Sequence, residues 1–344
     1  MNYGIPYKGS KSGIVAKFFP LLPAADHFYD LFAGGCAVTH YAMLSRKYPH
    51  IVANDLCGGP LRLFADAVAG KYHDETRWIS REDFHALKDT DPYVAYCWSF
   101  GNIGEDYIYG EKIEPYKRAL HMAVFFDQWD ELRTLCPEAW QAAYDGIHHL
   151  ADRKQRRILI GRSIVGWLKQ HGTEQMIQDN PLYASCHFRG GKPKDHIHLQ
   201  SLESLERLER LQSLERLQSL EGLPTKRLET YTGDYRSVQI LPRSVIYCDI
   251  PYIGTDGTTA AADYRTDEGM KNEFSHEDFY DWCERQTEPL FISSYQMPPD
   301  RFRCVWETKK VSAFSGTGGK ITTERLFIPR HQQHTIPQQL ALFE

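Results

Sequence analysis

Several features that mark membrane and secreted proteins are missing from this chain of 344 residues. No apolar run approaches the roughly 20 residues that a membrane-spanning helix needs, and residues 1–6 lack the charged-then-apolar layout of a signal peptide. The eight cysteines form no C-x-x-C pair, which favours a reduced cytoplasm over a disulfide framework. The net charge of −5 gives no overall sign of nucleic-acid binding, but it does not exclude a local basic surface.

The composition is that of a soluble globular protein, with 42% hydrophobic and 25% charged residues. The length is sufficient for one large core and an inserted or second domain. Aromatic residues make up 13% of the chain. We expect most of them in the core and a few to stack on nucleic-acid bases.

The prediction of function depends most on residues 244–252. Residues 245–248 are uncharged and bounded by turn formers, as in a buried parallel strand. Ligands of open α/β sheets bind just beyond the carboxyl ends of such strands, where Asp249 and Tyr252 stand and Pro251 stiffens the turn. A carboxylate and an aromatic face on a rigid turn suit a flat heterocycle with an exocyclic amine. An ordinary strand end is the alternative.

Two further stretches predict a site for an adenosine-containing cofactor. Residues 28–38 are typical of a strand, a glycine turn and a helix, and Gly34 lets the backbone approach a ligand, although the turn is not G-x-G-x-x-G. Residues 51–55 predict a second strand, which ends in Asp55 at the spacing of a ribose-binding carboxylate. Residues 7–12 form a basic loop that suits a carboxylate or phosphate; a solvated loop is the alternative.

The middle of the chain, residues 61–198, has the pattern of helices and loops. Residues 151–158 and 186–196 are basic, and cationic loops with aromatic residues suit phosphate contacts; a solvated face is the alternative. We predict no metal site, because no standard zinc finger has the spacing of Cys186, His187, His196 and His198.

Residues 199–223 carry a leucine at every third position. On an α-helix each three-residue step falls about 60° short of a full turn, so the leucines spiral around the axis. A 3₁₀-helix would align them, but runs of that length are uncommon, and the spacing is not a coiled-coil heptad. The Glu, Gln, Arg and Leu content favours an α-helix. Near-identical triplets predict an insertion of tolerated variable length.

After the repeat, strands and loops return. Residues 230–235 predict a strand and turn that carry Asp234, and residues 254–272 predict a mobile lid. Ser275 is predicted to begin a helix in the manner of a capping box. Further strands are expected at residues 289–295, 302–314 and 321–329, the last two as a closing pair.

The order of these motifs resembles that of the Dam-type, alpha-group adenine-N6 DNA methyltransferases found in restriction–modification systems and phages. The resemblance covers about residues 3–329. The family's D-P-P-Y stands here as Asp249-Ile250-Pro251-Tyr252, and its F-x-G-x-G as Phe32-Ala33-Gly34-Gly35-Cys36. Ile250 and Cys36 depart from the family pattern.

The resemblance implies an α/β fold: a Rossmann-like, S-adenosylmethionine-dependent methyltransferase sheet with a closing β-hairpin, and a mainly helical inserted DNA-recognition domain. The catalytic domain would be discontinuous, with residues 1–60 and 225–330. Residues 61–198 would form the target-recognition insertion, followed by the triplet repeat at 199–223 and a flexible tail at 331–344.

The resemblance also implies roles for single residues. The catalytic residues would be Asp249, Ile250, Pro251 and Tyr252. The cofactor-binding residues would be Tyr7, Lys11, Phe32, Gly34, Gly35, Asp55, Asp234 and Asp249. The candidate DNA-binding residues are Arg153, Arg156, Arg157, Arg189, Lys192 and Lys194. The tail is similar to the Q-L-x-L-F peptide that binds the replication sliding clamp, through Gln339, Leu340, Leu342 and Phe343.

The implied reaction moves a methyl group from S-adenosylmethionine to the N6 amine of an adenine flipped out of double-stranded DNA. Asp249 and the Ile250 carbonyl would accept hydrogen bonds from the amine, and Tyr252 would stack on the base. Three alternatives stay open from the sequence: a cytosine-N4 DNA or RNA methyltransferase, a catalytically decayed DNA-binding module, and a scaffold recruited to replication.

Overall fold

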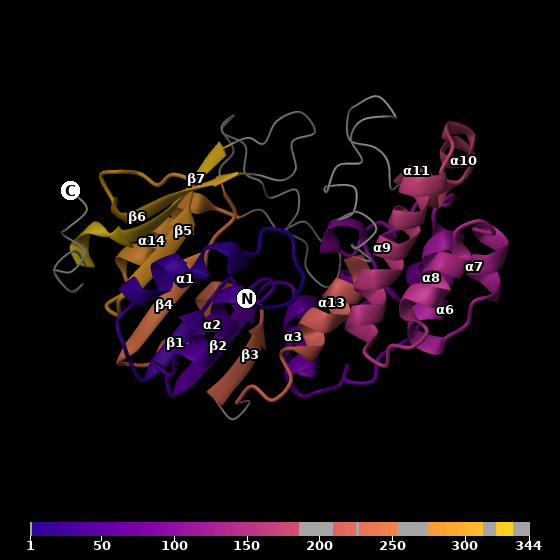
Figure 1. Cartoon of the computed structure of the whole chain (residues 1–344). Helices are drawn as coiled ribbons and strands as arrows, with labels where there is room; N and C mark the ends of the chain where they lie inside the picture. Colours follow the sequence, from indigo (N-terminus) through magenta and orange to yellow (C-terminus); the bar gives the residue numbers. More distant parts are fainter. Residues whose placement is uncertain (1, 186–208, 225–226, 253–273, 312–320, 333–344) are drawn as a thin grey trace. The chain divides into compact units, whose positions relative to one another are not determined.

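The computed structural model describes residues 2–185, 209–224, 227–252, 274–311 and 321–332 (Figure 1). The chain divides into two compact units. The first, which we call the sheet unit, consists of Met1–His73 and Arg216–Glu344. The second, the helical unit, is Asp74–Glu215. The predicted lid, most of the predicted clamp-binding tail and the first part of the leucine repeat lie outside the described residues.

The described strands of the sheet unit form one seven-stranded sheet in the order β3-β2-β1-β4-β5-β7-β6. Strands β1 to β5 are parallel where they pair, and β7 is antiparallel to both β5 and β6. This confirms the expected Rossmann-like α/β sheet with a closing hairpin. The strands are β1 (His27–Asp30), β2 (His50–Asp55), β3 (Leu228–Thr232), β4 (Ser244–Asp249), β5 (Leu290–Ser294), β6 (Phe302–Val311) and β7 (Ile321–Pro329).

Strand β4 lies near the middle of the sheet and is covered on both faces. Ile246 and Cys248 are buried in a cluster with Phe279 of α14 (His276–Glu284). The intervening Tyr247 points to the opposite face, where its ring stacks on Phe18 of α1 (Val15–Phe18) with centroids 5.5 Å apart. Burial on both faces explains why this segment carries no charge before Asp249.

The order of the parallel strands reverses between the neighbouring strands β1 and β4. From β1 the parallel strands continue through β2 to β3, and from β4 they continue to β5. Such a reversal opens a crevice at the carboxyl ends of the strands. Asn54 ties these ends together, since its side-chain amide donates to the carbonyls of Leu31 at 3.1 Å and Gly233 at 3.0 Å. The candidate site lies at this edge.

Shorter elements complete the sheet unit. Ser275 caps α14 by accepting a hydrogen bond from the Asp278 N–H at 3.2 Å, which confirms the predicted helix start. The other elements are η1 (Lys11–Gly13), η2 (Phe19–Leu21), α2 (Ala37–Ser45), α3 (Gly58–Val68), η5 (Tyr235–Ser237) and η7 (Arg330–Gln332).

The helical unit has the helices expected in the middle of the chain. Its core is a continuous cluster of buried apolar side chains from α6, α7, α8 and α9. The helices are α4 (Arg81–Leu87), α5 (Pro92–Cys97), η3 (Phe100–Asn102), α6 (Glu114–Phe126), α7 (Asp130–Leu135), α8 (Trp140–Ile147), α9 (Arg153–His171), α10 (Glu174–Asp179) and α11 (Pro181–Ser185).

The described part of the leucine repeat begins with an α-helix, α13 (Glu209–Gln218), as predicted. Leu214 and Leu217 are buried three residues apart, on nearly the same side of the helix. Leu220 is also buried, and it lies in the turn after the helix has ended. The helix therefore ends before the leucine spiral would carry the third side chain away from the core.

No helix in the described parts of the chain is long and apolar enough to span a membrane. The cysteines that the structure describes are all free thiols. The candidate zinc ligands between residues 186 and 198 lie outside the described residues.

Candidate active site

The glycine turn after β1 is held by the acid at the end of β2. The Gly34 N–H donates to Asp55 Oδ2 at 2.7 Å, and the Cys57 N–H donates to Asp55 Oδ1 at 3.0 Å. Gly34 has a φ of +47°, in the left-handed region that favours glycine. Asp55 thus orients the turn in addition to facing the pocket described below.

The N-terminal segment lies directly on this turn. The Ile5 N–H donates to the Gly35 carbonyl at 2.8 Å. A Cβ atom at Gly35 would come within 2.4 Å of the Cβ atom of Tyr7, so only glycine fits. The structure therefore brings together Tyr7, Gly34, Gly35 and Asp55, four of the residues predicted to bind the cofactor.

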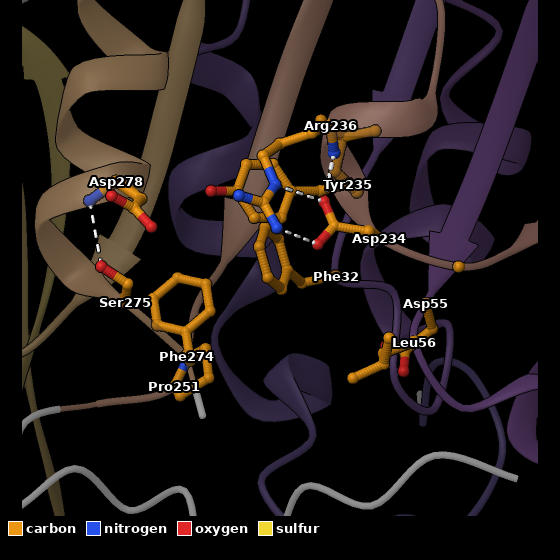
Figure 2. Close-up of a pocket in the computed structure, with 12 residues that line it drawn as sticks. Phe32, Asp55, Leu56, Asp234, Tyr235, Arg236, Pro251, Phe274, Ser275 and Asp278 are labelled. Carbon is orange, nitrogen blue, oxygen red and sulfur yellow. Dashed lines mark hydrogen bonds and ion pairs between the residues drawn. The ribbon is translucent and has the colours of Figure 1, made fainter. Parts of the chain in front are cut away.

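A pocket opens beside the turn and encloses about 660 Å³ of empty space, including space open to solvent (Figure 2). Phe32, Asp55 and Asp234, three of the residues predicted to bind the cofactor, line it. Its apolar wall includes Tyr235 and Phe274, whose ring centroids lie 5.2 Å and 5.7 Å from that of Phe32. Other lining residues that the sequence reasoning did not single out are Leu31, Leu56, Gly233 and Arg236.

Asp234 is paired with Arg236 inside this pocket. Arg236 Nε lies 2.9 Å from Asp234 Oδ1, and Nη2 lies 2.7 Å from Oδ2 (Figure 2). Hydrogen bonding to the arginine lowers the pKa of Asp234. The carboxylate therefore stays ionised at neutral pH, ready to accept a hydrogen bond from a ligand.

The Asp-x-Pro-Tyr motif joins residues from three separate segments. Lys11 Nζ lies 2.7 Å from Asp249 Oδ2. The Tyr252 hydroxyl lies 3.0 Å from Asp249 Oδ1 and 2.9 Å from Glu324 Oε2 on β7, with hydrogen-bond geometry to both. Lys11, predicted to bind the cofactor, therefore contacts Asp249 of the Asp-x-Pro-Tyr motif and is not among the residues that line the pocket.

Burial and the close approach of opposite charges together set the charges of this group. The residues Lys11 and Glu324 are 4% and 3% exposed. Burial acts to lower the pKa of Lys11, but the nearby carboxylates outweigh it and the pKa is raised, so Lys11 is a cation. Burial raises the pKa of Asp249 despite the opposing effect of Lys11. Burial also raises the pKa of Tyr252 well above its ordinary value, so its hydroxyl stays protonated.

The ring of Tyr252 has two neighbours. The Lys11 ammonium lies over it, 4.9 Å from the centroid. The Tyr295 ring is tilted by 53° against it at a centroid distance of 4.3 Å. A planar base that enters this site would meet an aromatic and cationic environment.

Ile250, which departs from the family tetrapeptide, has a structural explanation. Its side chain is 1% exposed and belongs to the core cluster that includes Ile246 and Phe279. The following carbonyl, that of Pro251, is hydrogen-bonded to His276 Nε2 at 2.8 Å. Core packing and this contact fix the turn without the first proline.

Cys36, the second departure, adopts a φ of +56° and a ψ of +31°. This left-handed conformation costs a residue with a side chain about 1–2 kcal/mol. The side chain is fully buried, and burial raises the pKa of the thiol well above its ordinary value. Cys36 is thus a strained but chemically inert member of the turn.

Asp30, at the end of β1, was not singled out by the sequence reasoning. Its Oδ2 accepts hydrogen bonds from the Thr39 N–H at 3.0 Å and the Thr39 hydroxyl at 2.6 Å. Burial raises its pKa to about 7, against the lowering effect of Thr39. Asp30 therefore titrates near neutral pH.

The three described candidates for DNA binding differ in their surroundings. Arg157 is buried and lies 2.9 Å from Glu215, and Arg156 donates to Asp127 at 2.6 Å. Arg153 is exposed, over the Phe125 ring. Arg189, Lys192 and Lys194 lie outside the described residues.

Comparison with known families agrees with the sheet and its site. Residues 7–95 match the model of the D12 class N6 adenine-specific DNA methyltransferases. The match includes Lys11, the glycine turn and Asp55, while the Asp-x-Pro-Tyr motif lies beyond it. Among curated proteins, none matches the chain. The strand order and the assembled motifs agree with this match, which indicates an adenine-specific DNA methyltransferase.

Proposed function

We propose that this enzyme transfers the methyl group of S-adenosylmethionine to the N6 amine of an adenine flipped out of double-stranded DNA. One observation carries the proposal. The Lys11 ammonium is a hydrogen-bond donor and the Asp249 carboxylate is an acceptor. They lie 2.7 Å apart at the carboxyl ends of the parallel strands. An adenine presents the complementary pair on one edge, the N1 acceptor next to the N6 donor.

The pocket lining fits the adenosine part of the cofactor. Phe32 and Tyr235 provide apolar faces for a purine ring, and Asp55 and Asp234 provide acceptors for ribose hydroxyls and an exocyclic amine. S-adenosylmethionine, when bound, supplies the reactive methyl group on its sulfonium. The residues of the chain hold and orient the reactants.

At the target base, Asp249 would accept a hydrogen bond from the N6 amine and Lys11 would donate one to N1. The carboxylate stabilises the positive charge that develops on nitrogen during the transfer. The Ile250 carbonyl is a further candidate acceptor, and the Tyr252 ring is the candidate stacking surface. Because the amine is enclosed in the stacked duplex, the base must first leave it.

The helical unit is proposed to contact the DNA target, in line with the predicted recognition insertion. Among the three candidates that the structure describes, Arg153 suits a phosphate contact best because its side chain is exposed. Arg156 and Arg157 are engaged by Asp127 and Glu215, which favours a structural role for them. Arg189, Lys192 and Lys194 remain candidates from the sequence alone.

The proposed reaction is tested by transfer of tritiated methyl groups from S-adenosylmethionine to unmethylated DNA. We expect label in N6-methyladenine on nucleoside analysis and its loss in Asp249→Ala. Glu229→Gln, which changes an exposed carboxylate on β3, is the matched control and should keep the activity. Equal labelling by Asp249→Ala and the wild type would refute the proposed role of the motif.

The tail proposal is separate and rests on sequence. We propose that Gln339, Leu340, Leu342 and Phe343 bind a sliding clamp. Deletion of residues 339–344 should remove binding to a purified bacterial clamp while methyl transfer to short DNA stays unchanged. Retained clamp binding would exclude this peptide as the contact.

A further inference from the structure

Glu324 is a buried carboxylate on a strand that the family motifs do not include. It lies in β7, opposite Thr308 of β6 in the closing hairpin. Its Oε2 accepts a hydrogen bond from the Tyr252 hydroxyl at 2.9 Å and lies 3.9 Å from Lys11 Nζ. Both partners belong to the proposed target-base site.

An isolated buried carboxylate is costly unless it is paired and hydrogen-bonded. These two partners come from η1 and from the turn after β4, not from the hairpin that carries Glu324. The closing hairpin is therefore connected electrostatically to the site. We propose that Glu324 is a positioning residue for methyl transfer, which fixes Tyr252 and Lys11 and tunes the charge on Asp249; this inference rests on the proposed function.

The first part of this role is geometric. The link between Tyr252 and Asp249 is local, because the two residues are three positions apart. Glu324 adds an anchor from 72 residues away, on a strand built into the sheet. With carboxylates on two sides, the Tyr252 hydroxyl is held in place, and the ring that would meet the base is held with it.

The second part is electrostatic. Lys11 lies between two carboxylates, 2.7 Å from Asp249 and 3.9 Å from Glu324, so its positive charge is shared. Without the charge of Glu324, Lys11 would act on Asp249 alone, and the repulsion between the carboxylates of Glu324 and Asp249 would disappear. The titratable groups that act on Asp249 or are acted on by it come from several elements: Asp30, Tyr247, Cys248, Tyr252 and Tyr295, in addition to Lys11 and Glu324.

The direction of the effect follows from the causes that act on Asp249. Burial raises the pKa of this carboxyl most, Lys11 lowers it, and Glu324 raises it. Replacing Glu324 with glutamine keeps the size and a hydrogen-bond acceptor for Tyr252 but removes the charge. The pKa of Asp249 should then fall. Because the ionised form accepts the amine, the acidic limb of kcat/KM should move to lower pH.

The experiment compares Glu324→Gln and Glu324→Ala in the full-length protein. Glu307→Gln on β6 is the control, since its carboxylate is exposed and pairs with Arg325. We expect Glu324→Gln to shift the acidic limb downward and to lower kcat roughly 10-fold, and Glu324→Ala to lower it further. Calorimetry with S-adenosylhomocysteine should give wild-type affinity for both variants, because Glu324 is not among the residues that line the pocket.

Tyr252→Phe is the second variant, and it removes the hydroxyl while leaving Glu324 in place. We expect a lower kcat with unchanged S-adenosylhomocysteine affinity, and less than additive losses when it is combined with Glu324→Gln. The inference is overturned if Glu324→Gln has the wild-type pH profile and rate, or if Tyr252→Phe keeps the wild-type kcat. A wild-type protein that yields no N6-methyladenine would instead refute the proposed function itself.

Discussion

Arg216 donates a hydrogen bond of 2.6 Å from its Nε to the backbone carbonyl of Gly4. The same guanidinium also donates to the carbonyl of Tyr3. On the other side, the Gly4 N–H donates to His40 Nδ1 at 3.0 Å. Burial, followed by the charge of Arg216, lowers the pKa of His40 to about 4, so the imidazole is neutral and can accept this bond at pH 7. The end of the leucine repeat thus holds the segment that lies on the glycine turn.

We therefore expect Arg216→Ala to weaken cofactor binding without changing the fold. Loss of hydrogen bonds from a charged donor costs about 1.5–3 kcal/mol, and the segment before Tyr7 would loosen. Calorimetry with S-adenosylhomocysteine should show at least a 10-fold loss of affinity, and hydrogen exchange should accelerate at the Ile5 amide. Arg285→Ala, an exposed arginine after α14, is the control. Unchanged affinity and unchanged hydrogen exchange in Arg216→Ala would contradict the proposal that Arg216 holds this segment.

The contacts at the end of the leucine repeat limit where residues can be removed from it without loss of structure. Gln218 donates to the carbonyls of Tyr72 and His73, and Glu221 pairs with His73 at 2.8 Å. Removal of two triplets from residues 199–204 should leave the protein folded and active. Replacement of both Arg216 and Gln218 by alanine should lower the melting temperature and the methyl-transfer rate, since it removes these contacts at the end of the repeat. Equal melting temperatures and methyl-transfer rates for the deletion and the double variant would contradict this distinction.

A methyl group added at Gly35 should disrupt the proposed cofactor site. The Cβ atom would lie 2.4 Å from the Cβ of Tyr7, and overpacking of this kind costs about 1–3 kcal/mol. We expect Gly35→Ala to displace the N-terminal segment and to lower S-adenosylhomocysteine affinity, measured by calorimetry. Gly13→Ala is matched to it, because a Cβ atom there meets nothing within 4 Å. A similar affinity in both variants would show that the close packing is not needed.

The buried Asp30 predicts a dependence of stability on pH. Its folded-state pKa is raised to about 7, above the ordinary aspartate value, so the folded state binds this proton more tightly than the unfolded state. The stability from the bound proton is present at acidic pH and is lost as the pH rises through about 7. Asp30→Asn removes this titration. The free energy of unfolding of Asp30→Asn, taken relative to that of the wild type, should therefore rise by about 1–3 kcal/mol between pH 5 and pH 8.

Urea unfolding of the wild type and Asp30→Asn at the two pH values measures this difference. Asp281→Asn on α14 is the control, because that carboxylate is exposed and pairs with Arg301. A constant difference between wild type and Asp30→Asn across the range would show that Asp30 does not titrate there.

Local patterns predicted the parts of the site whose partners are near in sequence or follow from the sheet. The uncharged run before Asp249 identified β4, and the glycine turn with Asp55 followed from strand order. Glu324 and His276 could not be found in this way. Their partners, Tyr252 and Pro251, become neighbours only when the sheet and α14 assemble. No local pattern marks Glu324, because it follows two threonines and precedes Arg325 in β7.

The basic segment in α9 shows the same limit of a local pattern. A run of arginines reports charge, but not whether each charge is already paired. Arg157 is buried against Glu215, a residue of the leucine repeat 58 positions away. The difference between the buried Arg157 and the exposed Arg153 becomes visible only in the packing of the helical unit.

Lys11 should affect the pH profile in the direction opposite to Glu324. It lies 2.7 Å from Asp249 and lowers the pKa of that carboxyl against the dominant effect of burial. In Lys11→Gln the pKa of Asp249 should therefore rise, so the carboxylate is lost at a higher pH and the acidic limb of kcat/KM moves upward. We also expect at least a 100-fold lower kcat, because the donor to N1 is weakened. Lys17→Gln, an exposed lysine on α1, serves as the control. Limbs that move in the same direction in Lys11→Gln and Glu324→Gln would contradict the arrangement of one cation shared by two carboxylates.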